Sequence, residues 1–311
     1  MRSKSGLPSP ASDYLTKPPT KAPSWHGLVV FDVWFNNLTA GLFLVAALSQ
    51  LIAPEPFSNV TRVAFPLAFL LLIVDLVLLV LDLGDPWRFH HMLRVFKPSS
   101  PMSLGTWCLT AYSLPLAIAA LLALLGIQPG WFEALVLITG ILPALGTAIY
   151  KGVLFSTSSQ PGWKDARWLG SYLTSSAFLL GSALFVVLAI WMKQDRAIEI
   201  LRPALVGLLL LNGVTIGLLL VGLCDSFGQF DLRSKHWLIG LTTFIGGYFM
   251  PLVLIAMVGT STLLAAACLI IFAALILRYQ LIQLPEAAAH RQGGAAVDPS
   301  QDSDRPTGRL A

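Results

Sequence analysis

Long apolar runs constrain this chain more than any other feature of its sequence. Each of eight runs is long enough to cross a hydrocarbon layer of about 30 Å as a helix, and proline, glycine and charged residues separate them. Only 12% of the residues are charged, about half the fraction of a typical soluble domain. We therefore predict an all-α integral membrane protein with eight transmembrane helices. The expected spans are residues 31–53, 63–82, 107–126, 131–154, 168–192, 202–223, 237–258 and 260–281.

The eight expected spans divide naturally into two groups of four, although no sequence repeat relates the groups. Residues 1–29 are a polar segment rich in Pro, Ser, Thr and Lys, expected to be flexible, and too long for the charged start of a cleavable signal peptide. Residues 30–165 and 166–284 are predicted to form two four-helix bundles. Residues 285–311 are low in large apolar residues and are expected to be a disordered tail.

The distribution of basic residues predicts the orientation. Sixteen of the 20 Lys and Arg residues fall on the side that would hold both termini. The positive-inside rule then predicts that both termini are cytoplasmic and that the chain spans a bacterial inner membrane. The net charge of +4 reflects this anchoring and does not indicate nucleic acid binding.

Cysteine and histidine positions argue against a metal centre in this chain. Cys108, Cys224 and Cys268 are widely spaced, form no CxxC pattern and are expected to be small buried hydrophobic residues. A transmembrane haem needs paired histidines inside the membrane. Every histidine instead lies at the end of a run, in a loop or in the tail: His26, His90, His91, His236 and His290. We predict no haem, iron–sulfur cluster or other metal here.

The loop between the second and third expected spans contains more basic residues, histidines, prolines and tryptophans than an ordinary membrane loop. It reads "LDLGDPWRFHHMLRVFKPSSPMSLGTW", from Leu81 to Trp107, and carries five basic or histidine side chains, three prolines and two tryptophans. Such a composition indicates a function beyond connecting two helices.

Polar residues inside the first two spans also need an explanation, because ionisable side chains are costly in lipid. Asp32 and Asn36 are four residues apart and share a helix face, and Asn37 lies beside them. A capped helix start with solvated Asp32 would explain the first of these but not both asparagines. Asp75 is surrounded by apolar residues, and Asp82 follows it by seven positions on nearly the same face. Asp75 either bonds a neighbouring helix or cation, or takes part in proton transfer or ligand binding.

The fourth span ends with Tyr150 and Lys151, on the same side of the membrane as the loop from Leu81 to Trp107. Lys151 is expected to extend its ammonium group to the surface. Tyr150 offers a phenolic donor. Spans one, two and four and the loop therefore place polar groups together at one membrane face.

The loop resembles the signature of the NrfD/PsrC family, the membrane subunits of polysulfide-reductase-type complexes. The second helix of that family ends in a similar "LDLG" turn followed by "PxRF", and "SPMSxGxW" opens the third. The stretches "NLTAGLFLVA" (37–46) and "YKGVLFSTSSQPGW" (150–163) are similar to its first and fourth helices. The resemblance covers residues 30–165. Asp85, Lys97 and Asp32 depart from the usual residues at their positions, which affects the expected headgroup contacts.

The resemblance implies a quinone site, for menaquinone or ubiquinone, in the first bundle and a docked iron–sulfur subunit that serves a molybdopterin catalytic subunit. Tyr150 as donor and Asp32 as proton acceptor are then the expected catalytic residues. The expected quinone-binding residues are Asn36, Asn37, Arg88 and His91. Arg88 and His91 would otherwise steer the docked partner.

Further residues are expected to act around that site. Asp75 and Asp82 are candidates for moving protons, and Arg94 and Lys97 are candidates for docking the partner.

Two other functions remain compatible with the sequence. The chain could be a membrane anchor or proton-conducting subunit without quinone chemistry of its own. A secondary transporter is disfavoured, because the second half offers only Asn212 as a polar group near mid-membrane. The sequence leaves open the terminal substrate, the quinone type, the direction of electron flow, proton pumping and the membrane side of the partner.

Overall fold

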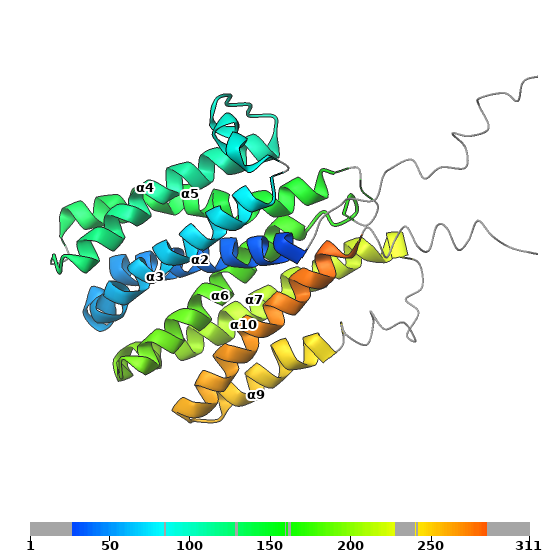
Figure 1. Cartoon of the computed structure of the whole chain (residues 1–311). Coiled ribbons are helices and arrows are strands. Elements are labelled where there is room, and N and C mark those ends of the chain that lie inside the picture. Colours follow the sequence, from blue (N-terminus) through cyan, green and yellow to red (C-terminus); the bar gives the residue numbers. More distant parts are fainter. Residues whose placement is uncertain are drawn as a thin grey trace, which may run out of the picture.

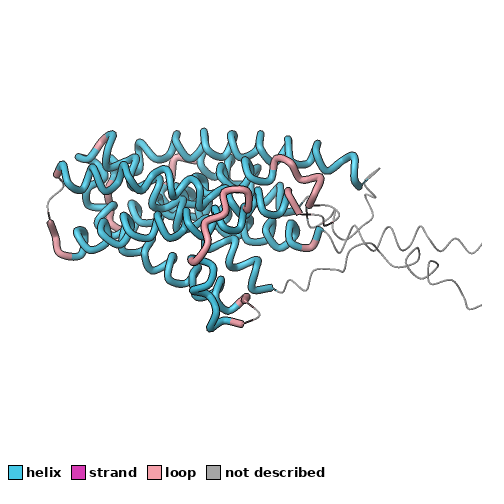
Figure 2. Tube along the Cα trace, turned by 90° about the horizontal axis from the view of Figure 1, so that it is seen from above, coloured by secondary structure: helices cyan, strands magenta, loops and turns pink. Residues whose placement is uncertain are grey.

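The computed structural model describes residues 27–83, 85–127, 130–158, 160, 163–227, 240 and 242–284, and all regular structure within these ranges is helical. Figure 1 shows the helices packed side by side in one elongated bundle, and Figure 2 shows the short loops that join them. The elements are α2 (Gly27–Ile52), α3 (Pro54–Leu81), η1 (Pro86–Leu93), α4 (Pro101–Leu124), α5 (Trp131–Ser156), α6 (Leu169–Trp191), α7 (Asp195–Phe227), η2 (Ile245–Phe249), α9 (Met250–Ala256) and α10 (Thr260–Ile282).

The prediction of an all-α membrane protein is confirmed. Seven helices within the described ranges are long and apolar enough to cross a membrane, and each matches one of the eight expected spans. The expected span 237–258 corresponds in the described residues to a shorter apolar helical stretch, Thr242–Ala256. Its first residues, 237–239, lie outside the described residues, so an eighth span stays a prediction.

The connection between α2 and α3 differs from the sequence-based expectation. Hydropathy predicts a loop over residues 54–62, but α3 already begins at Pro54, leaving Ala53 as the single non-helical residue. Proline is favoured at the first helical position because its fixed φ suits a helix and its missing N–H has no intrahelical partner there. The Thr61 hydroxyl then donates to Gln50 Oε1 over 2.9 Å and ties the two helices together near the turn.

Helices α2 and α6 lie at the centre of the molecule. Seventy-eight percent of the α2 span and 72% of the α6 span is buried, against 28–33% in the other five. The two helices cross closely at Gly41 and Gly181. A Cβ atom on Gly41 would overlap the carbonyl group of Ala177, and one on Gly181 would overlap the backbone of Gly41. Small residues at this crossing let the two backbones touch.

Because the helices run alternately up and down, several segments that are far apart in the sequence lie at the same end of the bundle. The start of α2 and the end of α10 lie at the same end of the bundle, and the segment that contains η1 stands out from the helices between α3 and α4 (Figure 1). Because α2, α3, α4 and α5 alternate in direction, the last turns of α3 and α5 also lie at this end.

Candidate functional site

Three helices bring a buried ion-pair cluster together near the end of the bundle that carries η1. The Lys151 Nζ atom of α5 lies 2.8 Å from Asp32 Oδ2 of α2 and 3.5 Å from Asp75 Oδ1 of α3. Lys151 also donates to the backbone oxygen of Asp32 over 3.1 Å. All three residues are at most 5% exposed. We call Lys151, Asp32, Asp75 and Asn36 the polar cluster.

Asn36 completes the polar cluster from the next turn of α2. Its Nδ2 atom donates to Asp75 Oδ2 over 3.2 Å, so both oxygens of Asp75 are engaged. Because residues four apart share a helix face, Asp32 and Asn36 reach α3 and α5 together. A buried charge is costly unless it is paired and hydrogen-bonded, and these bonds provide that compensation.

Three buried polar atoms around the polar cluster have no hydrogen-bond partner among the described residues: Asp32 Oδ1, Asn36 Oδ1 and Thr147 Oγ1. Thr147 lies one turn before Lys151 on the same face of α5. Two acceptors on α2 and one hydroxyl on α5 thus remain available to another polar group. The sequence does not single out Thr147, because a lone threonine in an apolar helix commonly bonds its own backbone.

A second set of bonds links α2, α3 and α4 one turn deeper. The Thr39 hydroxyl donates to the Ala68 carbonyl oxygen over 2.7 Å. The Tyr112 hydroxyl of α4 donates to the Thr39 carbonyl oxygen over 3.0 Å and lies 3.0 Å from the Thr39 hydroxyl. These bonds fix the spacing of the helices around the polar cluster.

Tyr150 lies beside the polar cluster but faces α4. Its side chain is 7% exposed, and its ring occupies the space where a Cβ atom on Gly105 would stand. The Lys151 ammonium group is 5.6 Å from the ring centroid. The glycine of the "SLGTW" sequence therefore makes room for this tyrosine.

Asn37, expected at the quinone, points to a different helix. Its Nδ2 atom donates to the Leu173 carbonyl oxygen of α6 over 2.7 Å, which ties the two central helices together. Its Oδ1 atom has no partner among the described residues. A direct ligand role for Asn37 stays a prediction.

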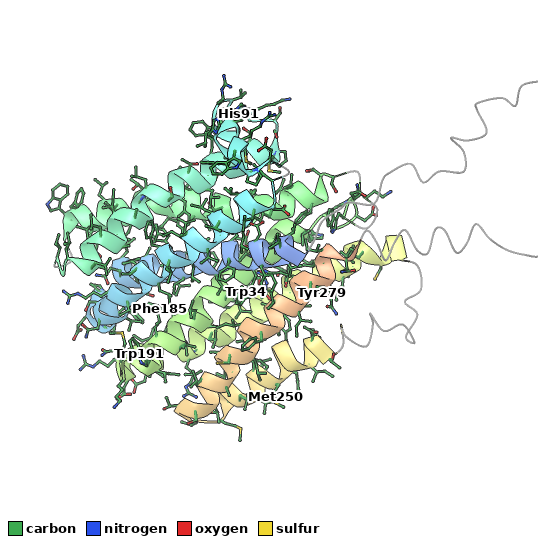
Figure 3. All side chains as sticks on the ribbon, in the orientation of Figure 1. Trp34, His91, Phe185, Trp191, Met250 and Tyr279 are labelled. Carbon is green, nitrogen blue, oxygen red and sulfur yellow. The ribbon has the colours of Figure 1, made fainter. Side chains whose placement is uncertain are left out.

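The loop residues lie on the surface, outside the polar cluster. Arg88, His91, Arg94 and Lys97 are all exposed, as is Asp82 at the end of α3. Figure 3 shows His91 on the segment that projects from the bundle. Arg88 Nε pairs with Asp85 Oδ2 at 3.0 Å. The structure brings Asp32, Asn36 and Asp75 together with Lys151, and it does not bring Arg88 or His91 to them.

Two sequence-based expectations about cations and polar groups are wrong. Lys151 does not extend to the surface, because the two carboxylates hold its ammonium group inside. Asn212 is not the only convincing polar group in the second half. It belongs to a buried network with Tyr248 and Ser175, near the fully buried Arg278.

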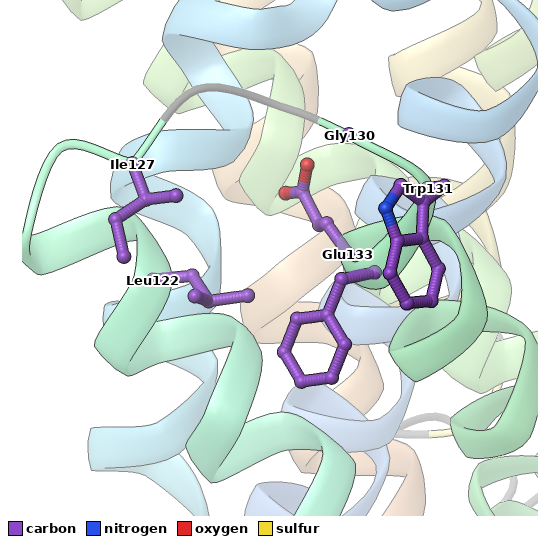
Figure 4. Close-up of a pocket in the computed structure, with 6 residues that line it drawn as sticks. Leu122, Ile127, Gly130, Trp131 and Glu133 are labelled. Atoms are coloured by element: carbon purple, nitrogen blue, oxygen red, sulfur yellow. The ribbon is translucent and has the colours of Figure 1, made fainter.

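A pocket in the described part of the chain lies far from this chemistry. It lies between the ends of α4 and α5 opposite to the polar cluster, has a volume of about 100 Å³ and is lined mainly by Leu122, Ile127, Trp131 and Phe132 (Figure 4). Glu133 is the one ionisable side chain among its six lining residues, and the pocket lies away from the polar cluster. No group of three or more His, Cys, Asp or Glu side chains suited to a metal occurs among the described residues.

Seven apolar helices in the described ranges define an integral membrane protein, and α2, α3 and α5 hold a buried ion-pair cluster near one end of the bundle. Residues 22–291 match the family model NrfD_2, described as polysulfide reductase, and the chain belongs to this family. The chain is also similar to one subunit of the selenate reductase of Mesobacillus selenatarsenatis, with 33% identity over 84 residues. That match covers 27% of this chain and 20% of the relative's length.

Proposed function

We propose that this chain is the quinone- or quinol-reactive membrane subunit of a respiratory oxidoreductase complex. It would pass electrons between the membrane quinone pool and a docked iron–sulfur subunit, which serves a molybdopterin catalytic subunit. The observation that supports this proposal best is the polar cluster. Three helices of a membrane protein place two carboxylates, an ammonium group and an amide together in a buried position.

The residues present fit a quinone headgroup. A bound quinone supplies two-electron redox chemistry coupled to two protons, and its oxygens need donors or acceptors according to its redox state. Asp32 Oδ1 and Asn36 Oδ1 are buried acceptors without partners among the described residues, and the Thr147 hydroxyl is an unused donor there. We propose that Asp32 accepts or returns a proton, that Asn36 orients the headgroup and that Tyr150 donates from the α4 side.

Charge balance supports the role of the polar cluster in proton exchange. One ammonium group faces two carboxylates, so full ionisation would leave a net negative charge buried among apolar helices. Such a charge is costly, and one proton held by the pair of carboxylates removes it. We propose that this proton is the one exchanged during turnover, with Asp75 connecting the polar cluster towards Asp82 at the end of α3, about 10 Å further along the helix.

The exposed loop is proposed as the docking surface. Arg94 and Lys97 lie on it with Arg88 and His91, all four exposed. Trp87 and Phe96 add apolar surface, with exposed fractions of 86% and 55%. Aromatic residues and arginine are enriched at protein interfaces. The exposure of Arg88 and His91 favours contact with the partner subunit over contact with the headgroup.

The proposed membrane arrangement has eight spans in two four-helix bundles. The described stretch Thr242–Ala256 would form most of the seventh span, which is expected over residues 237–258. The excess of basic residues supports cytoplasmic termini in a bacterial inner membrane.

The proposal is tested by replacing the two proposed catalytic residues in the intact complex. Asp32→Asn and Tyr150→Phe should each lower quinone-linked turnover by about 100-fold or more, the usual loss when a general acid or base is removed. Electron transfer between artificial dyes and the partner subunits should persist, because it bypasses this chain. Glu55→Gln, at the opposite end of the bundle and exposed, is the control. Unchanged turnover in both site variants would contradict the assignment and favour a membrane anchor without quinone chemistry.

A further inference from the structure

The second half of the chain contains a fully buried arginine without a charge partner among the described residues. Arg278 of α10 is 1% exposed. Its Nη1 atom donates to the Ala274 carbonyl oxygen over 2.9 Å, and its Nη2 atom donates to the Ser176 hydroxyl over 3.1 Å. No carboxylate in the described residues lies within 4.0 Å of its guanidinium group. A buried cation of this kind calls for a compensating negative charge.

Arg278 and the polar groups around it include two hydrogen-bond donors without a partner among the described residues. Asn212 of α7 donates to the Ser175 hydroxyl over 2.7 Å and accepts from the Tyr248 hydroxyl. With the further bonds of Ser175 to the Tyr172 carbonyl oxygen and the Thr215 hydroxyl, these side chains all have partners. The Arg278 Nε atom and the Tyr172 hydroxyl are buried and have no hydrogen-bond partner within the described ranges. Both groups can donate a hydrogen bond.

A small cavity adjoins these groups between α6, α7, η2 and α10. Its polar lining comes from Tyr172, Ser176, Asn212 and Tyr248, and its volume is about 10 Å³. Arg278 lies behind this lining and donates to Ser176, which is part of it. The π-helical turn η2 positions Tyr248 here, and the adjacent Gly247 packs so closely on Ala273 that a Cβ atom would stand 2.5 Å from that side chain. A cavity of this size holds one water molecule or one ion of similar radius.

The geometry points to a binding site for a single monatomic anion, chloride, beside Arg278. The guanidinium group of Arg278, which bonds the lining residue Ser176, supplies the positive charge that favours an anion over water. The Tyr172 hydroxyl, on a residue that lines the cavity, supplies a hydrogen-bond donor. The size of the cavity excludes phosphate and a quinone headgroup. The site is distinct from the polar cluster, where Lys151 already has two carboxylates.

Acidic residues on the neighbouring helices do not replace this anion in the described structure. Helices α6, α9 and α10 contain no Asp or Glu, and the same holds for η2. Asp195 and Glu199 lie at the opposite end of α7. Asp32 of α2 is bound to Lys151. The side chain of Asp225, near the end of α7, lies outside the described part of the chain, so the test includes it.

The test measures halide binding by the purified complex in lipid nanodiscs. Replacing chloride by gluconate should lower the Tm of the wild-type complex, and added chloride or bromide should restore it in a saturable manner. Arg278→Gln should abolish this dependence. Tyr172→Phe should keep the fold, since its hydroxyl has no partner among the described residues, and should raise the half-saturating chloride concentration about tenfold, the effect of one lost hydrogen bond.

Two controls separate this site from other halide effects. Arg196→Gln, which removes an exposed cation paired with Glu55, and Asp225→Asn should both retain the chloride dependence. Crystals grown with bromide should show an anomalous peak beside Arg278 and Tyr172. Equal Tm values in chloride and gluconate, loss of the dependence in Asp225→Asn, or a water molecule without anomalous signal in the cavity would overturn the proposal.

Discussion

Lys151 is the residue on which the polar site depends. It joins α5 to α2 through Asp32 and to α3 through Asp75, and it is 4% exposed. Removing one member of a buried ionic group is more costly than replacing the whole group with neutral residues, because the charges left behind stay buried without compensation. The cluster therefore contributes to stability as a unit.

Replacing Lys151 with methionine should strongly destabilise the protein. Asp32 and Asp75 would lose the one cation that pairs with them among the described residues. We therefore expect the free energy of unfolding to fall by about 3–5 kcal/mol. Thermal unfolding of the purified complex measures this change.

The triple variant Lys151→Met, Asp32→Asn, Asp75→Asn should recover much of the loss, because it has no buried charge at this site. Arg196→Met is the matched control, since it breaks an ion pair whose side chains are 79% and 84% exposed and such surface pairs contribute little. Equal Tm losses in Lys151→Met and Arg196→Met would contradict the account.

At the residue scale, the sequence predicts which carboxylates matter but not their partners. Asp32, Asn36 and Asp75 stand out because polar residues in apolar runs need a reason, and all three lie in the polar cluster. Lys151 stands five residues before the end of its helix, a position equally compatible with a surface ammonium group. Only the packing of α5 against α2 and α3 decides between the two.

At the scale of elements, the crossing of α2 and α6 holds the two halves together. Gly41 and Gly181 bring the two backbones into contact, and Asn37 donates to the Leu173 carbonyl oxygen across the same interface. Asp32 and Asn36 lie on α2 too, so the position of this helix also sets the geometry of the polar cluster.

Adding one methyl group at the crossing should disturb both stability and function. Gly41→Ala would place a Cβ atom on the Ala177 carbonyl group, so the helices must separate. Overpacking of this kind typically costs about 1–3 kcal/mol. We expect a lower Tm and reduced quinone-linked turnover.

Gly207→Ala in α7 is the matched control for this crossing. A Cβ atom there meets nothing within 4 Å, and alanine favours the helix. The Tm of this variant should be unchanged or higher. A decrease in Tm in Gly207→Ala as large as that in Gly41→Ala would show that the crossing of α2 and α6 is not specially close.

Most element boundaries follow from hydropathy, and the exceptions have local causes. The expected spans and the observed helices agree closely for α5, α6 and α10. Hydropathy misses the early start of α3 because Ser58, Asn59 and Arg62 make its first turns polar, although Pro54 suits a helix start. Periodicity does not predict the π-helical turn η2, since a π-helix depends on packing around Tyr248.

At the scale of the whole molecule, the alternating helices place the start of α2, the loop with η1 and the end of α10 at one end of the bundle (Figure 1). The positive-inside rule predicts that this end faces the cytoplasm. The order of the seven described spans could be predicted from the sequence. The central position of α2 and α6 could not, because hydropathy does not separate the buried spans from the others: α2 has a mean hydropathy of 1.6 and α6 of 2.2, while the other five span 1.9–2.9.

Cysteine labelling tests the orientation. In a background without Cys108, Cys224 and Cys268, a cysteine at Gln194 should react with an impermeant maleimide in intact cells, because the α6–α7 turn is expected to face outward. A cysteine at Ser99, in the exposed loop before α4, should react only after permeabilisation. The reverse pattern would place the proposed docking surface outside the cell.

The most direct test of the central claim is photoaffinity labelling of the intact complex with a quinone that carries a photoreactive group on its ring. The polar cluster predicts labelled peptides from α2 and α5, around Asp32–Asn36 and Thr147–Lys151. Labelling should be competed by unmodified quinone and weakened in Asp32→Asn. Labels found only on partner subunits, or on this chain without competition, would contradict a quinone site at the polar cluster.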